Sequence, residues 1–382
     1  MNTTLTKKVQ ESFITTFSTK PLMIFSPGRI NIIGEHTDYN DGFVFPAAVD
    51  KGIIAAIQKS DTNISTAFAI DMNESVSFEL DKLKPSSEGS WENYVLGVVA
   101  EIQNRNRVVG NFNIAFSGDI PSGSGMSSSA ALENSVVYGL NELFNLGLSK
   151  TEMILISQKA EHNYVGVNCG IMDQYASMFG IENNALLLDC RTVEAKPFEI
   201  NFKEHELMLI NTNVKHSLSD SAYNDRRSAC ENIASLLGIK ALRDATEADL
   251  LTIKDQVTPE NYQKALYVIQ ENNRALKASK AMTDGDLETL GALIYGSHEG
   301  LSKQYKVSCD ELDFLVEQAK LNKHILGARM MGGGFGGCTI NLISKDAVDA
   351  FKLTVSKAYK EKFNKDCSIY SVKLSNGTHV IK

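Results

Sequence analysis

The sequence has no run of about 20 apolar residues, which is the length that a helix needs to cross a bilayer. The N-terminus, MNTTLTKKVQESFITTFSTK, also lacks the apolar core of roughly 7–15 residues that a secretory signal peptide contains. These two absences argue against a membrane protein and a secreted protein. We therefore expect a cytoplasmic protein without a membrane partner.

Cysteine is scarce and dispersed, and positive charge is not in excess. The six cysteines form no C-x-x-C pair, so neither a zinc site nor a disulfide framework is expected. The 38 Lys and Arg residues are outnumbered by 46 Asp and Glu, which gives a formal net charge of −8. Because phosphate backbones require a basic face, we expect no nucleic-acid partner. A local cradle of N–H groups or a metal ion could still hold a small anionic ligand.

The length and composition of the chain are those of a folded globular protein. Its 382 residues are 43% hydrophobic and 22% charged. This length exceeds what one hydrophobic core usually organises, so we expect two domains, 1–185 and 186–382. Strand-like and helix-like segments interleave in both halves, which predicts an α/β or α+β fold.

Hydrophobic periodicity predicts the elements that would position a site. The first ~20 residues are expected to form an amphipathic helix with Val9, Phe13, Ile14 and Phe17 on its apolar side. Two strands are expected on either side of a break at Pro27–Gly28. Other predicted strands are residues 52–57, 112–116, 184–190, 206–212, 324–330 and 338–344, with one more near the C-terminus. Predicted helices are residues 91–102, 132–143, 150–164, most of 223–302, and 347–363.

The first loop with chemical potential is PSGSGMSSSA, Pro121–Ala130, between a predicted strand and a predicted helix. Small residues allow the backbone to approach a ligand, and N–H groups at a helix start together with hydroxyls can bind an anion. The alternative is a Gly/Ser turn that caps the helix. The loop is not a Walker A motif, because the chain contains no Gly-Lys dipeptide.

The second loop is GGGFGG, Gly332–Gly337, which satisfies the dinucleotide-binding pattern G-x-G-x-x-G. That fingerprint requires a helix after the loop, whereas the strand-like CTINLI follows here. Two other interpretations stay open: a tight turn between strands, where glycine permits positive φ, and a second backbone wall against a nucleotide.

The third stretch is SPGRINIIGEHTDYNDGFVFP, Ser26–Pro46, in which a buried strand ends in charged residues. Glu35, His36 and Asp38 follow each other closely, and Arg29 precedes them. A metal site is one interpretation, although no second histidine lies nearby. Recognition of a sugar is another, because carboxylates accept hydrogen bonds from hydroxyls. A plain solvated turn with Asx-type bonds is the third.

The three stretches together resemble one family. GRINIIGEHTDYNDG resembles the galactokinase signature, without a break from Gly28 to Tyr39. PSGSGMSSSA and GGGFGG resemble the second and third motifs of the GHMP small-molecule kinases, and GVNCGIMDQYAS and SAYNDRR also fit. The one small departure is Met126, where leucine is common. The resemblance covers nearly the full length and implies an α+β fold of two lobes with the active site in the cleft between them.

The resemblance also implies an activity and site residues. The implied reaction is the ATP-dependent phosphorylation of the anomeric hydroxyl of galactose, which yields galactose 1-phosphate and ADP in galactose metabolism. ATP and galactose would be the ligands, and Mg²⁺ the cofactor. The matched positions are Asp173 and Arg29 for catalysis; Glu35, His36, Thr37, Asp38 and Tyr223 for the sugar; Gly123, Ser124, Gly125, Met126, Ser127, Ser128 and Ser129 for ATP; and Ser129 and Glu161 for Mg²⁺.

The chemistry of Asp173 can be considered on its own. Its neighbourhood, NCGIMDQYASMF, is largely apolar or neutral, so a buried carboxylate there needs a partner. Arg29 could hold Asp173 ionised, but a nearby cation also makes it a weaker base. Asp173 could therefore remove the sugar proton or mainly orient the hydroxyl, and its plain alternative is a helix-capping role. Tyr223 could be an ordinary half-buried aromatic, and we interpret His162 and His216 as ordinary polar residues.

Two other functions compete with a galactose kinase. A catalytically silent sugar sensor would bind the same ligands and act through a protein partner. The intact serine run and Asp173 favour the enzyme. A kinase of N-acetylgalactosamine or another sugar differs only in the shape of the pocket, and we predict that galactose is preferred.

Overall fold

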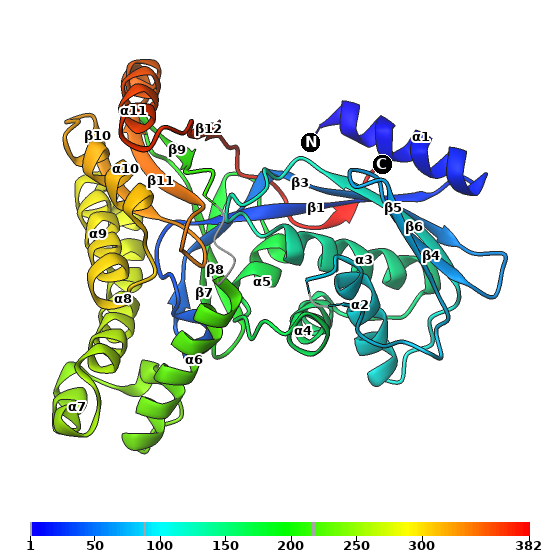
Figure 1. Ribbon diagram of the computed structural model, residues 1–382, viewed down its shortest axis with the longest axis horizontal. Helices are drawn as coiled ribbons and strands as arrows, with labels where there is room; N and C mark the ends of the chain where they lie inside the picture. Colours follow the sequence, from blue (N-terminus) through cyan, green and yellow to red (C-terminus); the bar gives the residue numbers. More distant parts are fainter. Residues whose placement is uncertain (1, 88, 215–218) are drawn as a thin grey trace.

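A six-stranded sheet forms the centre of the N-terminal half (Figure 1). The computed structural model describes residues 2–87, 89–214 and 219–382. The strand order is β13-β1-β3-β6-β4-β5, and neighbours are antiparallel except for the parallel pair β4–β6. The strands are β1 (Leu22–Asn31), β3 (Pro46–Lys59), β4 (Ser65–Ala69), β5 (Glu74–Phe78), β6 (Phe112–Gly118) and β13 (His379–Val380). β13 brings the last residues of the sequence beside β1.

Helices cover both faces of this sheet because its side chains alternate between two cores. Phe25 of β1 packs with α1 (Thr3–Phe17), whereas the adjacent Ile24 packs on the opposite face. The helices of the opposite face are α2 (Glu92–Asn104), α3 (Ser128–Phe144), α4 (Lys150–Ala160) and α5 (Met172–Phe179). The prediction for α1 was wrong at Ile14, which is 42% exposed. Val9 and Phe13 define its buried stripe at the i, i+4 spacing, and Ile14 lies beside that stripe.

The predicted break at Pro27–Gly28 is not present, because β1 runs through both residues. The pairing of β1 with β3 instead shifts register between Pro27 and Arg29. Such a bulge tolerates proline, which has no N–H for the ladder. Opposite Pro27 lies Gly52, where a Cβ would come within 2.4 Å of the Ser26 carbonyl oxygen. The strand therefore continues to Arg29 and carries its side chain to the site.

The C-terminal half is built on a four-stranded antiparallel sheet of order β10-β11-β9-β12. Its strands are β9 (His205–Asn211), β10 (Ile325–Met330), β11 (Cys338–Ser344) and β12 (Ser368–Ser371). Leu207 and Leu209 of β9 face α8 (Pro259–Asp284) and α9 (Leu287–Glu299). Met208 and Ile210 face α10 (Asp310–Lys320) and α11 (Val348–Phe363) on the other side. Successive side chains of β9 thus alternate between the two faces of the sheet, as the two-residue period of a strand requires.

A shared core joins the two halves of the molecule. Ile30 and Phe45 from the first half pack in one cluster with Leu209 and Ile340 of the second. A small sheet of β2 (Phe43–Val44), β7 (Asn184–Asp189) and β8 (Glu194–Glu199) lies between them. The helices α6 (Ser219–Leu236) and α7 (Glu247–Thr252) follow β9 in the sequence. The short helical turns are η1 (Asp38–Asn40), η2 (Glu161–Val165), η3 (Leu242–Asp244), η4 (Lys254–Gln256), η5 (Gly300–Gln304) and η6 (Lys345–Ala347).

The architecture confirms the predicted α+β class, with helices and mixed sheets. The domain boundary near residue 185 falls inside β7 and stays a prediction. Among the described residues, none of the helices combines the length and the apolar character needed to span a membrane.

Candidate active site

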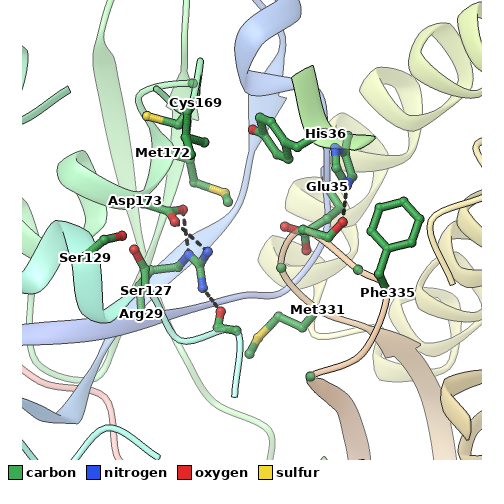
Figure 2. A pocket seen from close by; sticks show the side chains of 18 of the residues that line it. Arg29, Glu35, His36, Ser127, Ser129, Cys169, Met172, Asp173, Met331 and Phe335 are labelled. Atoms are coloured by element: carbon green, nitrogen blue, oxygen red, sulfur yellow. Dashed lines mark hydrogen bonds and ion pairs between the residues drawn. The ribbon is translucent and has the colours of Figure 1, made fainter. Parts of the chain in front are cut away.

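A cavity of about 480 Å³ lies where the loops of the two halves meet (Figure 2). These loops include the signature loop (Gly34–Gly42), the serine loop (Pro121–Ser129) and the glycine loop (Met331–Gly337). The lining residues from them and from neighbouring segments include Arg29, Glu35, His36, Asp38, Gly123, Gly125, Ser127, Ser129, Glu161, Cys169, Gly170, Asp173, Tyr223 and Gly332–Gly337. The stretches singled out in the sequence therefore converge on one cavity.

Arg29 and Asp173 form an ion pair on the wall of the cavity (Figure 2). The Arg29 Nε and Nη2 atoms each donate to one Asp173 carboxylate oxygen at 2.7 Å, so the pair is bidentate. Asp173 is the second residue of α5, and the third Arg29 nitrogen, Nη1, donates to the carbonyl of Gly125. Burial opposes the charge of Arg29, but the facing carboxylates of Asp173 and Glu35 raise its pKa. The pairing that the sequence suggested is therefore present.

Asp38 belongs to the signature loop and packs closely against the segment before α5. A Cβ at Gly170 would come within 2.0 Å of Asp38 Oδ2, so only glycine fits there. Burial, followed by the negative charges of Asp173 and Glu35, raises the pKa of Asp38 to about 7. Asp38 is thus a cavity carboxylate that is poised to accept a hydrogen bond from a ligand.

Glu35 is held by a fully buried arginine from β10. Arg329 Nη1 donates to Glu35 Oε2 at 2.6 Å. The same guanidinium donates to the backbone carbonyls of Asn31, Ile32 and Met330. Every nitrogen of Arg329 is thereby hydrogen-bonded, which is the condition under which a buried ion pair is stable. Arg329 joins the start of the signature loop to the C-terminal sheet.

His36 has a backbone φ of 62°, in the left-handed region, and its ring is fixed at both nitrogens. Nδ1 lies 2.7 Å from the Tyr39 hydroxyl oxygen, and Nε2 lies 3.2 Å from the Gly333 carbonyl oxygen. Burial lowers the pKa of His36 to about 3, and the cations Arg226 and Arg329 contribute in the same direction. The imidazole is therefore neutral, and its ring centroid lies 5.3 Å from that of Tyr223.

The serine loop forms a backbone cradle at the N-terminus of α3. Gly123 and Gly125 have φ angles of 66° and 70°, and Ser127 has a φ of 58°. A Cβ at Gly125 would lie 2.9 Å from the Met331 carbonyl oxygen of the glycine loop, so the two loops are packed backbone to backbone. The buried hydroxyl of Ser127 lines this space and has no hydrogen-bond partner in the part of the chain that the structure describes. A helix N-terminus with free donors is suited to phosphate.

The Ser129 hydroxyl and the Glu161 carboxylate both lie on the cavity wall. Gln174 donates to the same carboxylate at 2.8 Å. Burial, followed by the charge of Asp173, raises the pKa of Glu161 to about 7. No group of three or more His, Cys, Asp or Glu among the described residues could hold a metal ion. Mg²⁺, however, uses only one or two protein oxygens, and this hydroxyl–carboxylate pair fits that requirement.

Several predicted site residues do not line the cavity. Thr37 is fully buried, and its hydroxyl donates to the backbone carbonyls of Gly34 and Phe43. Of the serine-loop residues that were predicted to bind ATP, Ser124, Met126 and Ser128 lie outside the lining. Thr37 is placed to shape its loop, and Met126 belongs to the core between the two halves.

The remaining predicted features lie as follows. His162 Nε2 is 2.8 Å from the Cys169 carbonyl oxygen, which is an ordinary backbone bond, and His216 lies outside the described residues. The glycine loop is followed by β11 and not by a helix, so the dinucleotide-binding interpretation is excluded.

Sequence reasoning missed Arg329 and Gly170. Arg329 sits in an apolar strand, where a lone charge predicts a buried partner, and this signal was available. The need for glycine at 170 depends on the approach of Asp38 from a distant loop, and no local pattern reveals it.

Comparisons with known proteins agree with this geometry. Family models match the chain for the "GHMP kinases N terminal domain" at residues 93–181, the "Galactokinase galactose-binding signature" at 11–59 and "GHMP kinases C terminal" at 275–361. The mevalonate kinase of Methanococcus jannaschii shares the fold, with a TM-score of 0.65 and 18% identity over 94% of this chain and 99% of that one. The family models and the shared fold thus place the chain in the class of GHMP kinases.

Relatives that match nearly the full length of the chain show which family of GHMP kinases it belongs to. The galactokinase of Thermotoga petrophila is 41% identical over 94% of this chain and 100% of that protein, and that of Glaesserella parasuis is 40% identical over 94% of each. The Lactococcus lactis galactokinase complexed with galactose superposes with a TM-score of 0.93 at 33% identity, over 97% of this chain and 98% of that one. This chain belongs to the galactokinase family, and the resemblance seen in the sequence is confirmed.

Proposed function

We propose that this chain transfers the γ-phosphoryl group of ATP to the anomeric hydroxyl of α-D-galactose, giving α-D-galactose 1-phosphate and ADP. The observation that carries the proposal is the Arg29–Asp173 pair, which faces one cavity together with the signature loop and the serine loop. Phosphoryl transfer needs an oriented nucleophile and neutralised phosphate charge more than covalent help from the protein. The cavity offers groups for each of these tasks.

The sugar is assigned to the signature-loop side of the cavity. The Asp38 carboxylate accepts hydrogen bonds from vicinal hydroxyls, and Glu35 and Tyr223 complete this part of the wall. Asp173 receives the proton of the anomeric hydroxyl or orients that hydroxyl for attack. Arg29 fixes the Asp173 carboxylate through two hydrogen bonds and places positive charge where negative charge develops.

The nucleotide phosphates are assigned to the serine loop, with the glycine loop as the opposite backbone wall. The Ser127 hydroxyl and the first N–H groups of α3 donate to phosphate oxygens. Ser129 and Glu161 would hold Mg²⁺, which when bound neutralises charge on the transferring phosphoryl group. Cytoplasmic localisation remains part of the proposal.

The direct test is to measure ADP release by purified protein with ATP and Mg²⁺, with and without galactose. Release that depends on galactose supports the proposal, and glucose and N-acetylgalactosamine in parallel test the choice of sugar. Binding of both ligands by folded protein without any ADP release would instead identify a sugar sensor.

Asp38→Ala should raise the KM for galactose by roughly 10–100-fold, because a hydrogen bond to a charged group contributes about 1.5–3 kcal/mol. The KM for ATP should change little. Asp41→Ala is the matched control, since Asp41 belongs to the same loop but forms a part-exposed ion pair with Arg191. An unchanged galactose KM in Asp38→Ala would show that this loop does not hold the sugar.

Asp38 should also make stability depend on pH in the ligand-free protein. Its pKa is about 7 when folded, against 3.8 as the usual value, so between these limits the folded state holds a proton that the unfolded chain has lost. The free energy of unfolding therefore falls as the pH rises from about 4 to 7. Asp38→Asn removes this contribution, so its stability relative to the wild type should increase between pH 5 and pH 8. Thermal unfolding at both pH values measures the difference, and a constant difference would refute it.

A further inference from the structure

A chain of hydrogen bonds connects four side chains to the glycine loop. Cys230 Sγ on α6 lies 3.4 Å from the hydroxyl oxygen of Tyr305, which follows η5. Tyr305 and Tyr39 have their hydroxyl oxygens 2.7 Å apart, and Tyr39 reaches His36 Nδ1 at 2.7 Å. His36 Nε2 then meets the Gly333 carbonyl oxygen at 3.2 Å (Figure 2). The chain therefore runs from α6 through the signature loop to the glycine loop.

The donors along this chain can point in only one direction. A carbonyl oxygen only accepts, so Nε2 of His36 must carry the ring proton. The neutral imidazole then has a lone pair at Nδ1, which accepts from the Tyr39 O–H. The lone pairs of the Tyr39 oxygen are left to accept from the Tyr305 O–H, and Tyr305 in turn accepts from the Cys230 thiol. The Gly333 carbonyl in the cavity lining thus fixes the tautomer of His36, and the Tyr39 hydroxyl outside the lining supports it.

Both ring nitrogens of His36 are therefore committed to protein partners. We propose that His36 is a positioning residue that ties the signature loop to the glycine loop, and that Tyr39, backed by Tyr305, stabilises the tautomer on which this tie depends. This inference rests on the proposed function and changes the part of His36 within it. His36 contributes to the sugar side through the placement of its ring beside Tyr223, while its N–H group donates to the Gly333 carbonyl.

The tie has a consequence on the nucleotide side of the cavity. Gly332, next to Gly333, packs on the serine loop so closely that an added Cβ would lie 3.2 Å from the Gly125 carbonyl oxygen. Gly125 in turn accepts from Arg29, the partner of Asp173. Without the His36 bond, the glycine loop would keep its backbone bonds to Val307 and Thr212 but lose its tie to the signature loop next to this contact. Weaker nucleotide binding is the expected result, although neither Tyr39 nor Tyr305 lines the cavity.

Long-range ¹⁵N–¹H NMR of histidine-labelled protein tests the tautomer directly and requires no turnover. The chain has seven histidines, and the loss of one signal in His36→Gln assigns His36. We expect the Nε2–H tautomer from pH 6 to pH 8. The Nδ1–H tautomer or a doubly protonated ring in the wild type would overturn the inference, whatever the outcome of the activity assay.

Binding of a non-hydrolysable ATP analogue with Mg²⁺ tests the consequence. In Tyr39→Phe, His36 Nδ1 loses its donor, and the Kd for the analogue should rise about fivefold, the usual effect of one lost hydrogen bond. Tyr305→Phe leaves the bond between Tyr39 and His36 in place, so a smaller rise is expected. If Tyr39→Phe fails to fold, the Kd of Tyr305→Phe for the analogue serves as the test. Tyr295→Phe is the matched control, because its hydroxyl donates to the Ile325 carbonyl away from the cavity.

The order of the three effects decides the outcome. Nucleotide Kd values that rise in the order Tyr295→Phe, Tyr305→Phe, Tyr39→Phe support the inference, particularly with a mixed His36 tautomer in Tyr39→Phe. An unchanged nucleotide Kd in Tyr39→Phe, with only galactose binding weakened, would overturn it. A wild type that binds the analogue but releases no ADP would refute the proposed function and leave the tie intact.

Discussion

Asp173→Ala is expected to lower kcat by roughly a thousandfold or more while the protein stays folded, because a positioned acid–base group contributes about 10²–10⁴ in rate. The substitution also leaves Arg29 without its bidentate partner. In the proposed mechanism the anomeric hydroxyl would therefore lose both its proton acceptor and the fixed geometry around it. Galactose and ATP should still bind. ADP release measures kcat, and thermal unfolding shows that the fold is kept.

Asp173→Asn separates the two roles that the structure allows for this residue. An amide can orient a hydroxyl but cannot take its proton at neutral pH. A loss as large as that of Asp173→Ala would indicate proton removal, and a clearly smaller loss would indicate orientation. Asp71→Ala is the control, since Asp71 is also ion-paired but bonds Lys8 and Ser117 outside the cavity lining. Near-wild-type kcat in both Asp173 variants would remove Asp173 from the mechanism.

Arg329→Met should be the most destabilising single substitution of the site, by about 3–5 kcal/mol, because it leaves the buried carboxylate of Glu35 without a cation. Three backbone carbonyls also lose their donor. Urea unfolding measures the change in the free energy of unfolding.

Arg191→Met provides the comparison for this prediction. Arg191 pairs with Asp41 and Asp244 but is 31% exposed, so its loss should cost no more than about 1 kcal/mol. The double variant Glu35→Gln with Arg329→Met should recover part of the stability lost in Arg329→Met, because the unpaired charge is gone. Equal losses from Arg329→Met and Arg191→Met would contradict the assigned role of Arg329.

The parts that could be predicted from the sequence are those in which neighbouring residues act together. The strand–loop–helix setting of the serine loop and the strand after the glycine loop are local patterns, and both elements are present. The Arg29–Asp173 pair could be proposed although 144 residues separate its members. An aspartate in apolar surroundings needs a partner, and the family resemblance pointed to Arg29. The family resemblance then chose between the metal, sugar and turn interpretations of the signature loop.

The parts that could not be predicted depend on distant backbone geometry. The continuity of β1 through Pro27 requires Gly52 opposite it, and Pro-Gly by itself favours a break. The fit of Asp38 against Gly170 and of His36 against Gly333 depends on how separate loops meet. Thr37 is similar, because its place in the signature suggested the sugar, whereas its hydroxyl donates to the backbone carbonyls of Gly34 and Phe43.

The position of the transferred phosphate tests the central proposal most directly. Wild-type protein would be incubated with ATP, Mg²⁺ and galactose, and the product examined by ³¹P NMR with coupling to the sugar protons. We predict one sugar phosphate, coupled to the anomeric proton with the small coupling of the α-anomer, and its absence in Asp173→Ala. A phosphate on any other hydroxyl, or ATP consumption without a sugar phosphate, would contradict the placement of the anomeric oxygen between Asp173 and the serine loop.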